Sequence, residues 1–71
     1  MRVRPNGGAI RAIREAQSLS LRALSNRTGL NRGYLSRLER DQIRETAATT
    51  VQTIADALRV PTAAITHQET T

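Results

Sequence analysis

Apolar residues recur along the chain at intervals of three and four, and no segment alternates with a period of two over the length of a strand. This pattern predicts amphipathic helices and no sheet. The first helix is expected from Asn6, a plausible N-cap, to about Gln17. Ala9, Ile10 and Ile13 share one face of it. We therefore expect an all-α protein.

The stretch from Ser20 to Glu39 (SLRALSNRTGLNRGYLSRLE) predicts two short helices joined by a tight turn. Ser20 and Asn31 can each accept hydrogen bonds from the free N–H groups at a helix start. Gly29 can adopt the positive φ that ends the first helix, and the small Ser25 lets the second helix cross closely. This arrangement is typical of a helix-turn-helix unit, whose second helix is offered to the DNA major groove. An ordinary helical hairpin is the alternative for this stretch taken alone.

A fourth helix is expected from Thr46 to about Leu58, with Thr46 or Thr49 as its cap. Pro61 cannot continue that helix but can open the next one, so one further turn is expected over Ala63 to about Thr66. The apolar stripe of the fourth helix consists of Val51, Ile54, Ala55 and Leu58.

Length and composition exclude several classes of protein. Seventy-one residues make one domain with a thin core. The chain has no cysteine and a single histidine, His67, which argues against disulfides, thiolate zinc sites, metal centres and cysteine catalysis. No residues converge on a pocket suited to catalysis, so we expect no enzyme and no cofactor. No apolar run approaches the roughly 20 residues that span a bilayer, and the N-terminus lacks the apolar core of a signal peptide, so a cytoplasmic protein is expected.

The charge is strongly basic. Eleven basic residues, all arginine, stand against six acidic ones, which gives a formal net charge of +5. Such an excess on a small surface suits phosphate binding, and arginine forms planar bidentate contacts with phosphate or guanine. A genome biased toward arginine explains the missing lysines but leaves the net positive sign unexplained.

The order of these features resembles the Cro/CI-type helix-turn-helix family, also called the XRE family. The run IRAIREAQSLSLRALSNRTGLNRGYLSRLERDQIRE and the later VQTIADALRVPTAAI carry the resemblance, which covers about residues 7 to 66. It implies a compact five-helix lambda-repressor-like domain that binds duplex DNA and acts as a transcriptional repressor. The chain departs from the family pattern at Leu21, often glutamine, at Ser25, usually alanine, and at Asp41, commonly glycine. The Leu21 change puts one phosphate contact in doubt.

The resemblance places the recognition helix at about 31–39. With Leu35 and Leu38 turned inward, Arg32 and Arg37 face outward and are candidates for reading guanine; phosphate contact, or no contact, is the alternative for each. Gly33 lets the backbone approach the groove, and Ser36 can donate to a base or phosphate or remain solvated. The predicted DNA-binding residues are Arg22, Asn31, Arg32, Gly33, Tyr34, Ser36, Arg37, Arg40 and Arg44.

The remaining candidates have more than one interpretation. Asn31 caps the recognition helix. Tyr34, the single aromatic residue, either packs on the domain edge or contacts phosphate or a thymine methyl group. Arg22, Arg40 and Arg44 are expected to contact phosphates, with solvated side chains as the alternative. In the family, the positions of Arg14 and Glu39 form an internal ion pair, and we assign that structural role to them here.

We expect a flexible basic arm over 1–5, the helix-turn-helix domain over 6–66 and a disordered tail over 67–71. The expected function is sequence-specific binding of double-stranded DNA in transcriptional regulation, as a repressor. A recognition helix reads about half a site, so a homodimer on a palindromic operator is expected, formed through the fourth and fifth helices or the tail, or only on DNA. The alternative is an antitoxin-like or partner-binding module in which DNA binding is secondary. No membrane partner is expected.

Overall fold

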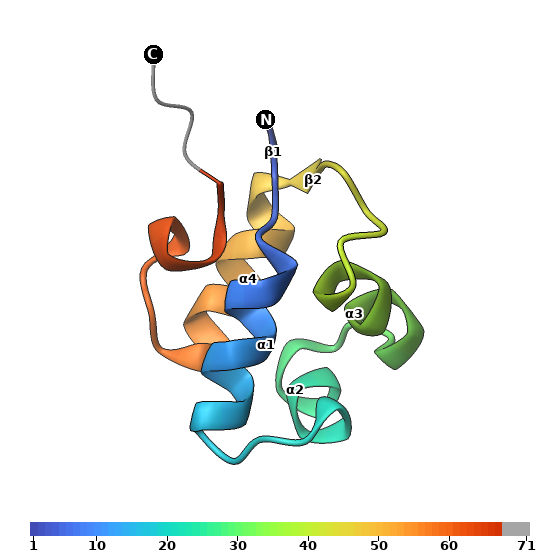
Figure 1. The fold of residues 1–71 in the computed structure, drawn as a ribbon, viewed down its shortest axis with the longest axis vertical. Coiled ribbons are helices and arrows are strands. Elements are labelled where there is room, and N and C mark those ends of the chain that lie inside the picture. The colour runs from blue at the N-terminus through green and yellow to red at the C-terminus, as the bar shows by residue number, and fades with distance from the viewer. Residues whose placement is uncertain (68–71) are drawn as a thin grey trace.

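The structure, a computed structural model, describes residues 1–67 and contains four α-helices, one 3-10 turn and a small two-stranded sheet within that range (Figure 1). Residues 68–71, which make up most of the predicted disordered tail, lie outside the described residues. The helices are α1 (Gly7–Ala16), α2 (Leu21–Thr28), α3 (Arg32–Glu39) and α4 (Ala48–Leu58). The strands are β1 (Arg2–Val3) and β2 (Thr46–Ala47), and the 3-10 turn is η1 (Thr62–Ile65).

The elements pack around α4. It contacts α2, η1 and both strands, while α1 contacts α3 and η1. In Figure 1, α2 and α3 lie on one side of the molecule and η1 on the other. The α2–α3 pair therefore packs on the other helices with one side and leaves its other side open to solvent.

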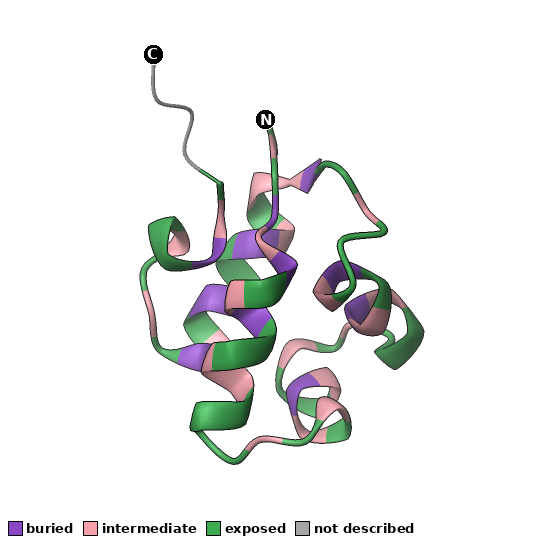
Figure 2. Cartoon of the chain, in the orientation of Figure 1, coloured by how far each residue is buried: buried purple, intermediate pink, exposed green. Residues whose placement is uncertain are grey.

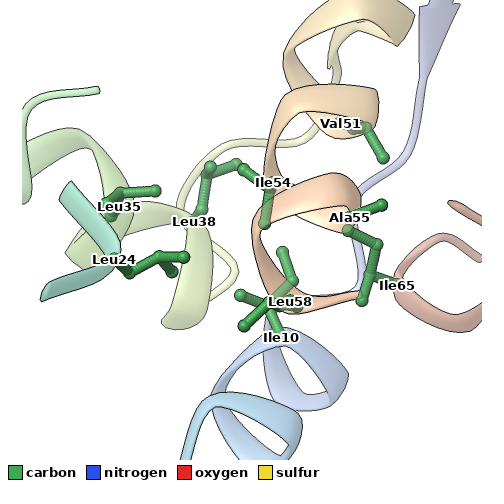
Figure 3. Packing of buried hydrophobic residues seen from close by; sticks show 9 residues of the cluster. All are labelled: Ile10, Leu24, Leu35, Leu38, Val51, Ile54, Ala55, Leu58 and Ile65. Atoms are coloured by element: carbon green, nitrogen blue, oxygen red, sulfur yellow. The ribbon is translucent and has the colours of Figure 1, made fainter. Parts of the chain in front are cut away.

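The core is small and entirely aliphatic. Figure 2 shows its buried positions on the inward sides of the helices, and Figure 3 shows Leu38 of α3 pointing toward Ile54 of α4. Burying such side chains stabilises the fold by roughly 1.5–3 kcal/mol each. The buried hydrophobic residues are Ile10, Leu24, Leu35, Leu38, Val51, Ile54, Ala55, Leu58 and Ile65.

The predicted helix starts are confirmed for the first three helices. The Asn6 side chain accepts from the N–H of Ala9 at 3.1 Å, and Ser20 Oγ accepts from the N–H of Ala23 at 3.0 Å. Asn31 Oδ1 accepts from the N–H of Gly33 at 2.7 Å. The prediction that Gly29 ends α2 is also confirmed, since its φ is 75°. These features depend on neighbouring residues alone, which is why the sequence reveals them.

The prediction of no sheet is wrong. Arg2 pairs with Ala47 and Val3 with Thr46 in antiparallel register. The N–H of Ala48 also donates to the Met1 carbonyl at 2.9 Å. Two-residue strands are too short to produce a recognisable alternation, and their pairing joins segments more than 40 residues apart.

The predicted cap of α4 is also wrong. The helix begins at Ala48, and its N-cap is Ala47, which makes no side-chain capping bond. Thr46 instead belongs to β2, and its side chain is buried. Thr49 lies inside the helix. The preceding residues are held extended by β1, so the helix starts where the strand pairing stops.

The prediction of five helices needs correction as well. The fifth element is η1, a single 3-10 turn in which the N–H of Ala64 donates to the Pro61 carbonyl at 3.0 Å. Four residues can form an i→i+3 turn but not a stable α-helix. Ile65 of this turn is fully buried, so η1 still closes the core.

Residues 1–5, predicted to be a basic arm, form β1 and an isolated bridge and are hydrogen-bonded on two sides. Beside the β1–β2 pairing, the N–H of Asn6 donates to the Ile65 carbonyl at 2.8 Å. The N–H of His67 donates to the Arg4 carbonyl at 2.9 Å, next to an isolated bridge between Pro5 and Thr66. The N-terminal segment thus lies between β2 and the residues that follow η1.

Candidate nucleic-acid interface

Helix α3 has one buried side and one exposed side. Leu35 and Leu38 are fully buried, whereas Arg32, Gly33 and Arg37 are exposed. Ser36, which is half-buried, lies between these two sides. The outward side predicted from sequence is therefore the free surface of this helix.

The turn before α3 is held by two side chains. The Ser25 hydroxyl donates to the Leu30 carbonyl, and the N–H of Leu30 donates to Thr28 Oγ1 at 3.1 Å. Gly29, in the left-handed conformation, stands between them. Ser25, the residue that replaces the family's usual alanine, thus adds a hydrogen bond across the turn, and the angle between α2 and α3 is fixed by contacts within ten residues.

Arg14 and Glu39 form the ion pair that the resemblance implied. Arg14 Nε donates to Glu39 Oε2 at 2.7 Å, and Nη2 donates to Oε1 at 3.0 Å. The two side chains are only 12% and 6% exposed. The hydrogen bond to Glu39 raises the pKa of Arg14, against the lowering effect of burial. A further bond from Arg14 Nη1 to the Leu19 carbonyl, at 2.7 Å, joins the α1–α2 connection to the pair.

A second link between α1 and α3 was missed from sequence. Gly7 is buried, and a Cβ built on it would clash with the carbonyl oxygen of Leu38 and lie 2.8 Å from that of Glu39. Its N–H donates to Asp41 Oδ1 at 3.1 Å. Asp41 has a φ of 57°, the left-handed region in which the family's glycine is favoured. That departure from the family pattern was the available signal, and the aspartate adds a cap for α1.

Tyr34 reaches away from the exposed side of α3. It is half-buried and packs against the core, and its hydroxyl is hydrogen-bonded to the Thr46 hydroxyl. This contact joins α3 to β2. Packing at the edge of the domain, one of the two interpretations of Tyr34, is the arrangement in the structure.

Three arginines of the described chain are in ion pairs, and the five of the predicted interface are not. Within residues 1–67 the ion pairs are Arg14–Glu39, Arg11–Glu15 at 3.3 Å and Arg2–Glu45 at 3.8 Å. The arginines of the predicted interface are exposed and join none of these pairs. They come from α2, α3 and the loop after α3, which lie on one side of the molecule in Figure 1. These residues are Arg22, Arg32, Arg37, Arg40 and Arg44.

The described part of the chain contains neither a group of metal-ligand side chains nor a helix suited to crossing a membrane. No three His, Asp or Glu side chains among residues 1–67 are grouped as metal ligands would be. None of the helices described there is long and apolar enough to cross a membrane.

Comparison with known families gives a match over most of the chain. The model of a helix-turn-helix family matches residues 10–65, a span that runs from the middle of α1 to the end of η1. It therefore includes the α2–α3 pair and the core that supports it. No curated protein matches the chain at a significant level.

Several solved structures are similar to this one. The restriction-modification controller protein C.AhdI from Aeromonas hydrophila is 29% identical, with a TM-score of 0.76 over 82% of this chain and 86% of that one. The clp gene regulator ClgR from C. glutamicum is 30% identical, with a TM-score of 0.73 over 80% and 73%. SinR, a master regulator for biofilm formation solved in complex with DNA, is 25% identical, with a TM-score of 0.75 over 79% and 89%.

Proposed function

Because the chain belongs to the Cro/CI-type, or XRE, helix-turn-helix family of DNA-binding transcriptional regulators, we propose that it is a sequence-specific repressor that reads the major groove with α3. The observation that carries this proposal is the exposed side of α3. Arg32, Gly33 and Arg37 are free there, while Leu35 and Leu38 hold the opposite side in the core.

Arg32 and Arg37 are the proposed base-reading residues. An arginine can donate two parallel hydrogen bonds to O6 and N7 of guanine, which discriminates against other bases by roughly 1–3 kcal/mol. Both side chains are exposed and free of carboxylate partners in the described part of the chain. Gly33 supports the same role, since the absence of a side chain lets this turn of α3 approach the base edges.

Arg22, Arg40 and Arg44 are proposed to contact phosphates on either side of the recognition helix. They belong to the start of α2 and to the residues after α3, where they can reach the backbone rather than the floor of the groove. Asn31 and Ser36 are proposed as further phosphate or base contacts. Tyr34 is assigned to packing, because its hydroxyl is bonded to Thr46.

A symmetric dimer on a palindromic operator is proposed for the complete complex. One recognition helix covers about half a site, and two-fold symmetry of the protein is matched by that of the site. The exposed positions of α4 and η1 include Thr49, Gln52, Ala63 and Ala64, and one acidic residue, Asp56, which accepts a hydrogen bond from Gln52. We propose that this side, which is not arginine-rich as the α2–α3 side is, pairs the two copies. SinR, one of the similar structures, was solved in complex with DNA, which supports duplex DNA as the proposed partner.

The test is selection of binding sites from random duplexes, followed by affinity measurements on the enriched sequence. A palindromic consensus is expected. Arg32→Ala and Arg37→Ala should each weaken binding to the consensus by about 10- to 100-fold and relax preference at one base position. Arg59→Gln is the control, because Arg59 is an exposed arginine at the C-terminal end of α4 and belongs to neither α2, α3 nor the loop after α3.

Two outcomes would contradict the proposal. Weak binding with no enriched sequence would favour the partner-binding module instead. If Arg32→Ala and Arg37→Ala weaken the affinity equally for all DNA sequences, α3 contacts only phosphates. Repression itself is tested by placing the selected site over a promoter, where transcription should fall when the protein is present.

A further inference from the structure

We infer that Arg4, Arg44 and His67 form a binding site for a phosphate group beside the C-terminal end of α3. The three residues line the same surface hollow, which has a volume of about 440 Å³. They belong to three separate parts of the chain: the N-terminal segment, the loop after α3 and the residues after η1.

The backbone around the hollow is held in place on each of its sides. The N–H of His67 donates to the Arg4 carbonyl at 2.9 Å, and Pro5, next to Arg4, is buried. Across the hollow, the N–H of Gln42 donates to the Arg37 carbonyl at 2.9 Å, which ties the loop to α3. These hydrogen bonds hold the backbone from which the lining side chains extend.

The charge of the hollow favours an anion. Arg4 and Arg44 form no ion pair and donate no side-chain hydrogen bond within residues 1–67. The single acidic residue in the lining is Asp41, and its Oδ1 already accepts from the N–H of Gly7. The lining therefore contains two guanidinium groups and one carboxylate, before any contribution from His67.

Phosphate is the anion that this set of donors suits best. Arginine guanidinium groups match the oxygens of a phosphate with paired hydrogen bonds, and the imidazole of His67 adds a further donor. The hollow is open to solvent and lies beside the proposed DNA-contacting residues. The phosphate can come from the DNA backbone or from a free phosphate group, and the two sources are separated by experiment.

The first arm titrates the 71-residue chain with inorganic phosphate at constant ionic strength and follows the amide NMR signals of residues 41–44 and of His67. Saturable shifts in these signals, weakened about tenfold by Arg4→Gln but not by Arg59→Gln, would assign the site to a free phosphate group. Arg4→Lys should recover only part of the binding, because it retains the charge but loses the paired hydrogen bonds.

The second arm rests on the proposed function and measures affinity for the selected duplex over a series of salt concentrations. If the site holds a DNA phosphate, Arg4→Gln and Arg44→Gln should each make the slope of log K against log salt shallower by about 1.8, because each variant removes the contact from both copies of the proposed dimer. Arg59→Gln should leave the slope unchanged, and equal melting temperatures for all variants would exclude unfolding as the cause.

The two hypotheses can fail separately. If the wild-type chain binds its consensus, while phosphate produces no saturable shifts and Arg4→Gln keeps the wild-type slope, the phosphate site is wrong and the proposed function stands. If phosphate binds at the hollow but no DNA sequence is enriched, the proposed function is wrong and the phosphate site stands.

Discussion

Among single residues, Gly7 leaves the least room for change. It lies where the start of α1 meets the carbonyl groups at the end of α3, and those backbone atoms cannot rotate away as a side chain can. The neighbouring Gly8 has only the Asn6 Oδ1 atom near its Cβ position, at 3.7 Å. A side chain at the first of these adjacent glycines would therefore clash with backbone, whereas a side chain at the second has room.

Gly7→Ala is expected to lower the free energy of unfolding by about 1–3 kcal/mol, since the helices must separate to admit the methyl group. Gly8→Ala is the matched control and should raise it by about 0.5–1 kcal/mol, because alanine suits a helix better than glycine does. Urea denaturation of both variants tests this. Equal effects in the two variants would show that the close contact at Gly7 is not required.

The Arg14–Glu39 pair is the second constraint at this scale. Glu39→Gln should lower the free energy of unfolding by about 3–5 kcal/mol, because it leaves a largely buried guanidinium without its carboxylate. Adding Arg14→Met should cost less than the sum of the two single changes. A double-mutant cycle in urea measures this coupling, and strict additivity would contradict it.

The pKa of Arg14 sets the pH range of that stabilisation. Because this pKa is raised in the folded state, the contribution of Arg14 is complete at any pH below the ordinary arginine pKa. It is lost only as the pH rises through the raised value. The stability that Arg14 supplies is therefore expected to stay constant across the neutral range.

At the scale of elements, α3 is fixed from several directions. The turn from α2 holds its start, α1 holds its end through Glu39 and the region of Gly7, and β2 holds Tyr34. These contacts leave α3 little freedom to rotate. Base reading requires such rigidity, because hydrogen bonds to base edges depend on a defined position of the helix.

Tyr34→Phe tests the link between α3 and β2. Loss of the hydroxyl leaves the buried Thr46 hydroxyl without its partner, so the free energy of unfolding should fall by about 1–3 kcal/mol. Combining it with Thr46→Val should recover much of that loss, because both polar groups are then removed. A large loss of DNA affinity at unchanged stability would instead place the Tyr34 hydroxyl at the DNA.

For the whole molecule, the distribution of charge matters more than its total. Three carboxylates are paired with arginines, and the arginines of α2, α3 and the following loop remain unpaired within residues 1–67. The net positive charge therefore lies mainly on the side that carries α2 and α3. This distribution favours approach to DNA with α3 facing the duplex.

DNA affinity is accordingly expected to fall steeply with salt. Three arginines proposed to contact phosphates in each copy give six in a dimer, which corresponds to a slope of log K against log salt of about −5. Binding should weaken about a thousandfold between roughly 50 and 200 mM salt. Fluorescence anisotropy on the selected duplex measures the slope, and a value near zero would contradict phosphate-dominated binding.

The sequence by itself determined the features that arise from neighbouring residues. The caps at Asn6, Ser20 and Asn31, the end of α2 at Gly29 and the inward side of α3 each depend on residues within one or two helical turns. The candidate arginines could be selected because a helix that buries Leu35 and Leu38 must expose the positions between them. The family resemblance supplied the Arg14–Glu39 pair, which no local pattern reveals.

Only the tertiary structure decided the contacts between distant segments. The β1–β2 pairing, the close approach at Gly7, the Tyr34–Thr46 bond and the Arg4–Arg44–His67 hollow each join parts of the chain at least 12 residues apart. Local propensity carries no information about such pairings, because they form when packing of the core brings those segments together. The sequence thus specified the helices and the outward side of α3, and the packing of the core determined how α3 is held.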